Sequence, residues 1–257
     1  MRIRKSQLGI LDWGIGGVGV YAQIKARLGN IPITYFSDTG VIPYGKMSRR
    51  ELVSRSNVVL AFLSAQGVTH LVVGCNAAST VLPFLSVDYM KVEGVIESAI
   101  RATEKMHPAQ LALIGGRRTV LSGVYRRAFA ARGITVKQRI GQRLSARIEN
   151  GDVASTALRT DCKAVLTPLS NCSHVLLACT HYPAIMPLLK DCLAKETVFI
   201  DPAAELVSRV AKWRLPREQN ESGRTDRFLT SGQPDKMRIA ASNAFGIEIK
   251  NVESVTI

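Results

Sequence analysis

The chain has 257 residues, of which 46% are hydrophobic and 21% charged, a composition typical of a globular protein and not of a disordered, collagen-like or disulfide-stapled chain. Its 34 Lys and Arg against 20 Asp and Glu residues give a net charge of +14, which favours anionic substrates, nucleic acids or acidic protein surfaces as partners. Five scattered cysteines and the lack of an 18-residue apolar run predict reduced thiols, no membrane segment and a cytoplasmic location.

Short apolar runs alternate with longer amphipathic segments along the whole chain. The runs predict strands at residues 8–11, 33–36, 71–73, 92–95, 111–114, 134–136, 175–178, 198–200, 227–230 and 247–252. Helical spacing predicts helices at residues 51–66, 119–131 and 203–213, and the polar segment 215–225 is predicted to be a loop. Because strands that alternate with helices are typical of parallel sheets covered on both faces, we predict an α/β fold.

A glycine-rich segment follows the first predicted strand. Residues 14–19 fit the pattern G-x-G-x-x-G, and Asp38 follows 19 residues after Gly19, which is the outline of a dinucleotide-binding fingerprint. However, Asp12 ends the strand just before the glycines, where its carboxylate would approach a bound pyrophosphate. We therefore interpret the glycines as a tight turn into a helix whose amides face a smaller anion.

The sequence contains an internal repeat. Residues 70–76 and 174–180, 104 positions apart, both read as His, three apolar residues, a small residue, Cys and a small polar residue. Each copy predicts a buried strand that ends in a cysteine, Cys75 or Cys179, followed by the start of a helix. Since ligands of open α/β sheets bind at the carboxyl ends of strands, the repeat predicts two similar domains that each present one cysteine.

Two cysteines at equivalent points of two domains suit a reaction that needs one base on each side of a carbon atom. Racemisation is such a reaction, because a thiolate removes the α-proton from one face and a thiol returns a proton to the other. A helix start or a neighbouring base lowers a thiol pKa, and both cysteines precede predicted helix starts. His181 is the candidate proton acceptor for Cys179, and Asp12 is the candidate to orient or deprotonate Cys75.

The motifs, taken together, resemble glutamate racemases of the aspartate/glutamate racemase superfamily. The resemblance covers Gly9 to about Ala211 and depends on residues 11–17, 35–39, 43–45, 75–79, 94–96 and 179–183. It implies an enzyme without cofactor that interconverts L- and D-glutamate and supplies D-glutamate for peptidoglycan. It also implies two doubly wound parallel-sheet domains related by pseudo-symmetry, residues 1–97 plus 211–257 and residues 98–210, with the active site between them. No metal is expected, because His70 and His174 lie at the far ends of their strands and Cys162, Cys172 and Cys192 lack the spacing of paired ligands.

The resemblance assigns residue roles by position. Cys75 and Cys179 are expected to be the two acid/base thiols, assisted by Asp12 and His181, and Glu149 falls where the family has a glutamate near the site. Asp12 and Cys75 belong to the first domain, and the other three to the second. The positions expected to contact the substrate, an acidic amino acid, are Trp13, Pro43, Tyr44, Gly45, Asn76, Ala77 and Thr180.

Two of these positions depart from the family. Trp13 stands where serine is usual, and Ala77 stands where threonine is usual, so two hydroxyls expected to bind substrate are absent together. Three hypotheses follow. The enzyme racemises glutamate with altered contacts; it has changed substrate, for example to aspartate, with Arg117 or Arg118 holding a carboxylate; or it is a non-catalytic relative retained for binding.

The binding hypothesis depends on an uneven distribution of charge. Residues 101–147 hold eleven Lys or Arg and one acid, Glu104. Such a face suits nucleic acid or an acidic protein, although no nucleic-acid motif accompanies it and this partner is not favoured. A homodimer is the assembly that the resemblance suggests. Cys162, Cys172 and Cys192 are interpreted as structural, and His70 and His174 as packing residues.

Overall fold

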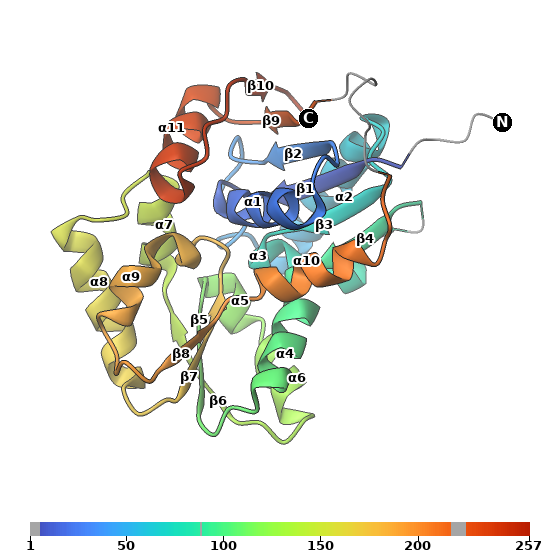
Figure 1. Cartoon of the computed structure of the whole chain (residues 1–257). Coiled ribbons are helices and arrows are strands. Elements are labelled where there is room, and N and C mark those ends of the chain that lie inside the picture. Colours follow the sequence, from blue (N-terminus) through green and yellow to red (C-terminus); the bar gives the residue numbers. More distant parts are fainter. Residues whose placement is uncertain (1–5, 88, 217–224) are drawn as a thin grey trace.

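The computed structural model describes residues 6–87, 89–216 and 225–257, and it contains two parallel β-sheets (Figure 1). The six-stranded sheet has the strand order β10–β9–β2–β1–β3–β4, and the four-stranded sheet has the order β6–β5–β7–β8. The strands of the first sheet are β1 Leu8–Asp12, β2 Ile33–Ser37, β3 His70–Val73, β4 Lys91–Gly94, β9 Arg227–Thr230 and β10 Glu253–Ser254. Those of the second are β5 Leu111–Gly115, β6 Val136–Ile140, β7 His174–Ala178 and β8 Val198–Ile200.

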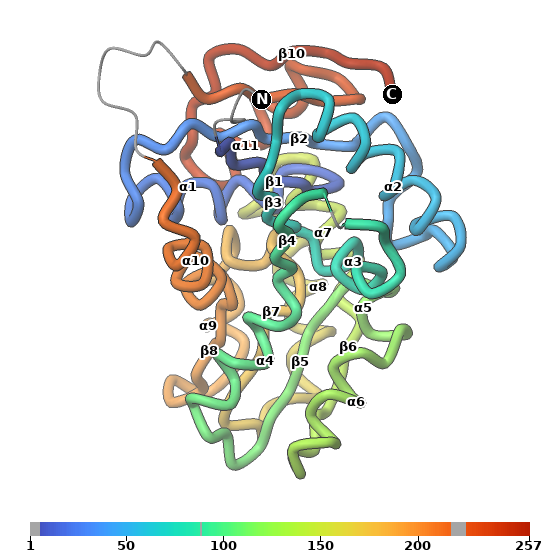
Figure 2. The backbone as a smooth tube through the Cα atoms, turned by 90° about the vertical axis from the view of Figure 1, so that its right-hand side faces the viewer, coloured from blue at the N-terminus to red at the C-terminus, as the bar shows by residue number. Residues whose placement is uncertain are grey.

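Helices cover both faces of each sheet, as the predicted α/β fold requires (Figures 1 and 2). They are α1 Gly16–Leu28, α2 Arg49–Ala65, α3 Asn76–Ser79, α4 Val95–Met106, α5 Arg117–Leu121, α6 Val124–Ala130, α7 Gln142–Glu149, α8 Thr156–Leu166, α9 Met186–Lys190, α10 Ala203–Ala211 and α11 Pro234–Phe245. Short 3-10 turns lie at Leu82–Phe84, Thr167–Leu169 and Tyr182–Ile185. Within the described residues, none of the helices combines the length and hydropathy that crossing a bilayer requires.

Successive side chains of a strand point to opposite faces of its sheet, and each face packs against its own layer of helices. In β5, Leu111 and Leu113 pack with residues of α4 and α6, whereas Ala112 and Ile114 pack with residues of α8. This is the two-residue period of a strand whose two faces are both buried. Ala112 and Ile114 share one apolar cluster with Leu8 and Ile10 of β1. One core therefore continues from the first sheet into the second.

The internal repeat corresponds to equivalent strands. β3 lies between β1 and β4, and β7 lies between β5 and β8. His70 pairs with the first residue of β1, and His174 pairs with the first residue of β5. Each imidazole Nδ1 also lies 2.9 Å from the hydroxyl oxygen of the preceding residue, Thr69 or Ser173. The two cysteine-bearing strands thus occupy the same place in their two sheets.

Three predicted elements were wrong in detail. The helix predicted at 119–131 is divided into α5 and α6 at Gly123, which has φ 69°, a backbone conformation that favours glycine. The strand predicted at 134–136 begins only at Val136, because the amide of Ile134 donates to Phe129 O and closes the end of α6. The strand predicted at 247–252 is absent from these described residues; Ile249 packs in the core, and its carbonyl accepts from Arg238 Nε at 3.2 Å.

The remaining sequence predictions have mixed outcomes. The strands predicted around residues 8, 33, 71, 92, 111, 175, 198 and 227 are confirmed, with bounds that differ by a residue or two. The loop predicted at 215–225 falls mainly on residues 217–224, which lie outside the described residues. All five cysteines lie in the described part of the chain and are free, as expected for reduced thiols.

Candidate active site

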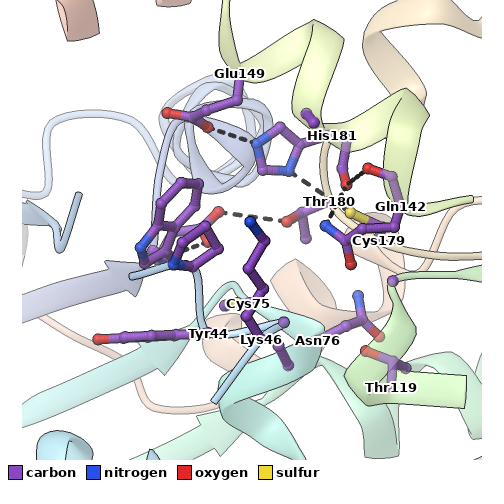
Figure 3. A pocket seen from close by; sticks show the side chains of 18 of the residues that line it. Tyr44, Lys46, Cys75, Asn76, Thr119, Gln142, Glu149, Cys179, Thr180 and His181 are labelled. Atoms are coloured by element: carbon purple, nitrogen blue, oxygen red, sulfur yellow. Dashed lines mark hydrogen bonds and ion pairs between the residues drawn. The ribbon is translucent and has the colours of Figure 1, made fainter. Parts of the chain in front are cut away.

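The carboxyl ends of strands from both sheets meet at one cavity. Asp12 ends β1, Cys75 lies two residues after β3, and Cys179 directly follows β7. The cavity has a volume of about 300 Å³ (Figure 3). It is lined by all twelve residues predicted for the site, namely Asp12, Trp13, Pro43, Tyr44, Gly45, Cys75, Asn76, Ala77, Glu149, Cys179, Thr180 and His181. Folding therefore brings together positions that are up to 169 residues apart in the sequence.

The side chains of Cys179, His181 and Glu149 contact one another in that order, from the cavity into the protein. His181 Nδ1 lies 3.6 Å from Cys179 Sγ, and His181 Nε2 lies 2.7 Å from Glu149 Oε2 (Figure 3). Burial favours the neutral imidazole, but Cys179 and Glu149 raise the pKa of His181 well above its usual value. A protonated His181 can therefore donate to both neighbours, and it sets a positive charge beside Cys179.

Amides in the turn before α1 and at its start bind two carboxylates of the protein itself. Asp12 accepts from the amide of Trp13 at 2.6 Å and from the amide of Gly17. Glu149, at the end of α7, accepts from the amide of Ile15 at 3.0 Å. We expected these amides to face a small anion, but they are occupied by carboxylates of the protein itself, since the N-terminus of a helix attracts negative charge.

The environment of Cys75 differs from that of Cys179. We expected a helix start to lower the thiol pKa, but α3 has only four residues, and burial together with the Asp12 carboxyl raises the pKa of Cys75 well above its usual value. Amides of Ala78 and Trp13 oppose this rise. Burial also raises the pKa of Asp12, an effect that the positive charge of His181 opposes. Cys75 is thus a thiol beside a carboxyl that binds protons more tightly than usual.

The close approach of α1 to the second sheet depends on a glycine. A Cβ atom on Gly16 would lie 2.5 Å from Thr180 Oγ1 and 2.6 Å from His181 Nδ1. We expect Gly16→Ala to lower the free energy of unfolding by about 1–3 kcal/mol, because the cost of overpacking exceeds the gain in helix propensity. Urea denaturation measures this difference. In the matched control Gly74→Ala the new Cβ has no neighbour nearer than 3.4 Å, and equal losses in the two variants would contradict the prediction.

Asn76 is positioned to hold a ligand. Its Oδ1 accepts from Tyr125 Oη at 2.7 Å, which fixes the orientation of the amide. Its Nδ2 is buried and has no hydrogen-bond partner among the described residues. A buried donor is normally paired, so this amide is oriented to donate into the cavity. Tyr125 lies on α6 and packs against the second sheet, so the contact also joins the two halves of the site.

A buried carboxylate holds the segment Pro43–Tyr44–Gly45 against the cavity. Asp38 is fully buried and accepts from Tyr44 Oη at 2.6 Å, from Ser231 Oγ at 2.8 Å and from Arg55 Nη2 at 2.6 Å. The same carboxylate also accepts from Arg55 Nε at 2.8 Å. Asp38, which in a dinucleotide fingerprint would contact a ribose, therefore serves here to fix a loop.

We expect Arg55→Met to lower the free energy of unfolding by about 3–5 kcal/mol, since it leaves the Asp38 carboxylate buried without its cationic partner. Urea denaturation measures the loss. The double variant Arg55→Met/Asp38→Asn should recover part of it, because the uncompensated charge is gone. A loss below about 1 kcal/mol in the single variant would show that the pair is not coupled as the hydrogen bonds indicate.

Several cavity residues were not expected from the sequence. They are Lys46, Gly116, Thr119, Gln142, Ser145, Ala146, Asn150, Ala178 and Lys236. Lys46 directly follows the Pro-Tyr-Gly segment, and this adjacency is the sequence signal that indicates it. Arg117 and Arg118, proposed as carboxylate ligands in a changed-substrate enzyme, do not line this cavity. They line a neighbouring one, to which Lys46 also contributes.

The basic segment 101–147 is partly neutralised by acids outside it. Arg101 pairs with Glu97, Lys105 with Glu205, and Arg147 with both Asp152 and Asp161. Arg132 pairs with Glu104, the one acid within the segment. The charge count along the sequence therefore overstated the free positive charge of this face. Among the described residues, no cluster of three His, Cys, Asp or Glu side chains has the arrangement of a metal site.

The chain is similar to known proteins over almost its whole length. A family model described as Asp/Glu/hydantoin racemase matches residues 8–210. A glutamate racemase of Desulforudis audaxviator is 30% identical over 270 residues, which cover 98% of this chain and 98% of that protein.

Two solved structures cover almost the entire fold. A glutamate racemase from Francisella tularensis in complex with D-glutamate has a TM-score of 0.89 and 23% sequence identity, over 99% of this chain and 98% of that one. A glutamate racemase from Thermus thermophilus in complex with β-chloro-D-alanine has a TM-score of 0.85 and 27% identity, over 100% and 99%. The arrangement of two parallel sheets is thus that of these proteins.

Proposed function

Because this chain belongs to the Asp/Glu/hydantoin racemase family, we propose that it interconverts L- and D-glutamate by proton transfer between Cα and two cysteines, Cys75 and Cys179. The observation that carries the proposal is that both sulfurs, each following an equivalent strand of its own sheet, line one cavity. The chain is an amino-acid racemase by family, and the glutamate bound in the Francisella tularensis relative supports an acidic substrate.

The proposed reaction conserves protons over one half-turnover. One cysteine, as thiolate, takes the proton from Cα, and the electron pair of the C–H bond remains on the carbon and its carboxylate. The other cysteine, as thiol, gives its proton to the opposite face of Cα. The configuration is inverted, and the two sulfurs have exchanged protonation states, so the reverse reaction starts from the product state.

The two sulfurs have different electrostatic environments. Burial and the Asp12 carboxyl hold Cys75 as a thiol, whereas Cys179 lies 3.6 Å from His181, which Glu149 helps to keep protonated. We propose that Asp12 accepts the Cys75 proton when that thiol must become a thiolate, a role that its raised pKa suits. Asn76 Nδ2, a buried donor without a partner among the described residues, is proposed to bind the α-carboxylate, where negative charge develops; the nearby Thr180 hydroxyl donates to Asp12 Oδ2 at 3.4 Å.

The wider context follows the family resemblance. We propose that D-glutamate made here enters peptidoglycan, and that residues 1–97 plus 211–257 and residues 98–210 form the two domains. The division is supported by the sheets, since every strand of the six-stranded sheet lies in the first set and every strand of the four-stranded sheet lies in the second.

Aspartate is the second candidate substrate, and one observation favours it. The Trp13 side chain lines the cavity, and its Nε1 donates to Val41 O at 3.2 Å, so a large ring occupies space where the family usually has serine. Aspartate is one methylene shorter than glutamate. Exchanging Trp13→Ser and Ala77→Thr should then shift the preference toward glutamate.

The test is proton NMR in D₂O, following deuterium incorporation at Cα of L- and D-glutamate, with aspartate and neutral amino acids alongside. Exchange and inversion of glutamate support the proposal. Exchange confined to aspartate keeps the chemistry and changes the substrate. A folded sample that exchanges no amino acid would overturn the proposal and favour a binding role for the basic face.

A further inference from the structure

Lys46 carries an unpaired positive charge into the cavity. Its side chain extends from the segment after Gly45 toward the space near Cys75 and Thr180 (Figure 3). The hydrogen bonds and ion pairs of the described residues give Lys46 Nζ no partner. An ammonium group directed into a substrate cavity attracts an anionic part of the ligand.

The backbone that carries Lys46 is held in place. The Lys46 amide donates to Pro43 O at 2.7 Å, and the Met47 amide donates to Tyr44 O at 3.3 Å. Tyr44 is in turn bound to the buried carboxylate of Asp38. The base of the lysine side chain is therefore fixed, and rotation about its own bonds determines where Nζ lies.

The carboxylates of the cavity do not neutralise this lysine. Asp12 accepts from the amides of Trp13 and Gly17, and Glu149 accepts from the amide of Ile15 and from His181. Both acids thus have donors of their own. A dicarboxylic substrate brings two further carboxylates, of which Asn76 is proposed to bind the one at Cα.

The cavity lacks two hydroxyls that the family resemblance leads us to expect at the substrate, since positions 13 and 77 are Trp and Ala, so a dicarboxylic substrate needs other polar partners. Lys46 and Lys236 are the two cationic amines that line the cavity within the described residues. Both lysines are exposed at the cavity mouth; Lys46 follows directly from the clamped Pro43–Tyr44–Gly45 segment, whereas Lys236 lies in the first turn of α11. Position and rigidity both favour Lys46 as the partner of the distal carboxylate.

We propose that Lys46 binds the side-chain carboxylate of the substrate and thereby selects dicarboxylic over neutral amino acids. The inference rests on the proposed racemase function and names the residue that sets its substrate class. A hydrogen bond to a charged group contributes enough that its loss changes affinity by about 10- to 100-fold.

The variant Lys46→Met tests this by Cα exchange in D₂O with glutamate and with glutamine, which has the same shape but a neutral amide. We expect KM for glutamate to rise about 10- to 100-fold with kcat within about threefold, and KM for glutamine to stay unchanged. Lys46→Arg should recover most of the affinity. The control Lys163→Met removes an equal charge from α8, outside the cavity, and should match the wild type.

Three results would overturn the inference. They are an unchanged KM for glutamate in Lys46→Met, an equal loss with glutamine, and a loss that appears in Lys236→Met instead. If only aspartate is exchanged, the same comparison uses aspartate and asparagine.

A failure of the proposed racemase function can be distinguished from a failure of the role proposed for Lys46. If the wild type exchanges no amino acid, calorimetric titration with L-glutamate and L-glutamine replaces kinetics. Tighter binding of glutamate that is lost in Lys46→Met would sustain the role of Lys46 without racemisation. Absent glutamate binding, or binding that Lys46→Met leaves intact, would overturn it.

Discussion

Replacing either Cys75 or Cys179 by serine is expected to lower the rate of racemisation by about 10²- to 10⁴-fold, the usual contribution of a positioned acid or base. A serine hydroxyl fits the same space but is a far weaker acid than a thiol. Each variant retains one functional cysteine, which still removes the α-proton from the enantiomer that faces it. We therefore expect each variant to exchange Cα deuterium with one enantiomer only, and the two variants to differ in which one.

The measurement separates inversion from exchange. Circular dichroism follows the conversion of one enantiomer into the other, and NMR in D₂O follows deuterium at Cα. Cys192→Ser is the matched control, because Cys192 Sγ donates to Leu188 O at 3.1 Å outside the cavity and serine can make the same hydrogen bond. A cysteine variant that exchanges both enantiomers at the wild-type rate would contradict the two-base proposal.

The second large effect concerns Glu149. In the variant Glu149→Gln the side chain can still accept from the Ile15 amide, but the negative charge beside His181 is lost. Burial disfavours the protonated form of His181, and only Cys179 and the more distant Asp12 carboxyl then remain to stabilise that charge. The pKa of His181 therefore falls. We expect the high-pH limb of kcat/KM to move to lower pH, and activity above that limb to fall by about 10- to 100-fold.

Stability should change with pH in the same variant. The pKa of His181 in the folded protein is raised, so its protonation stabilises the fold fully below the unfolded pKa of about 6.5. This stabilisation is lost as the pH rises through the raised folded pKa. The difference in unfolding free energy between wild type and Glu149→Gln should therefore shrink over that window. Glu97→Gln, which removes an exposed acid paired with Arg101, is the control; an unmoved high-pH limb in Glu149→Gln would contradict the assignment.

The sequence by itself determined eight of the ten predicted strands and the equivalence of the two cysteines. Apolar runs such as residues 111–114 predicted buried strands because both faces of a parallel sheet are covered. The repeat around Cys75 and Cys179 predicted one cysteine for each sheet, because equivalent strands of two similar sheets end at the corresponding edge. Local pattern suffices for these features because each depends on a few consecutive residues.

Only the tertiary structure showed which groups surround the cysteines and their neighbours in the cavity. Glu149 meets the amide of Ile15 and the ring of His181 across 134 and 32 residues of sequence, and no local pattern encodes such a meeting. The pKa of Cys75 was predicted to be low from a helix start, yet burial beside Asp12 raises it. Burial and charge at a site depend on every group that folding brings near it, and for that reason the sequence alone could not give the environment of Cys75.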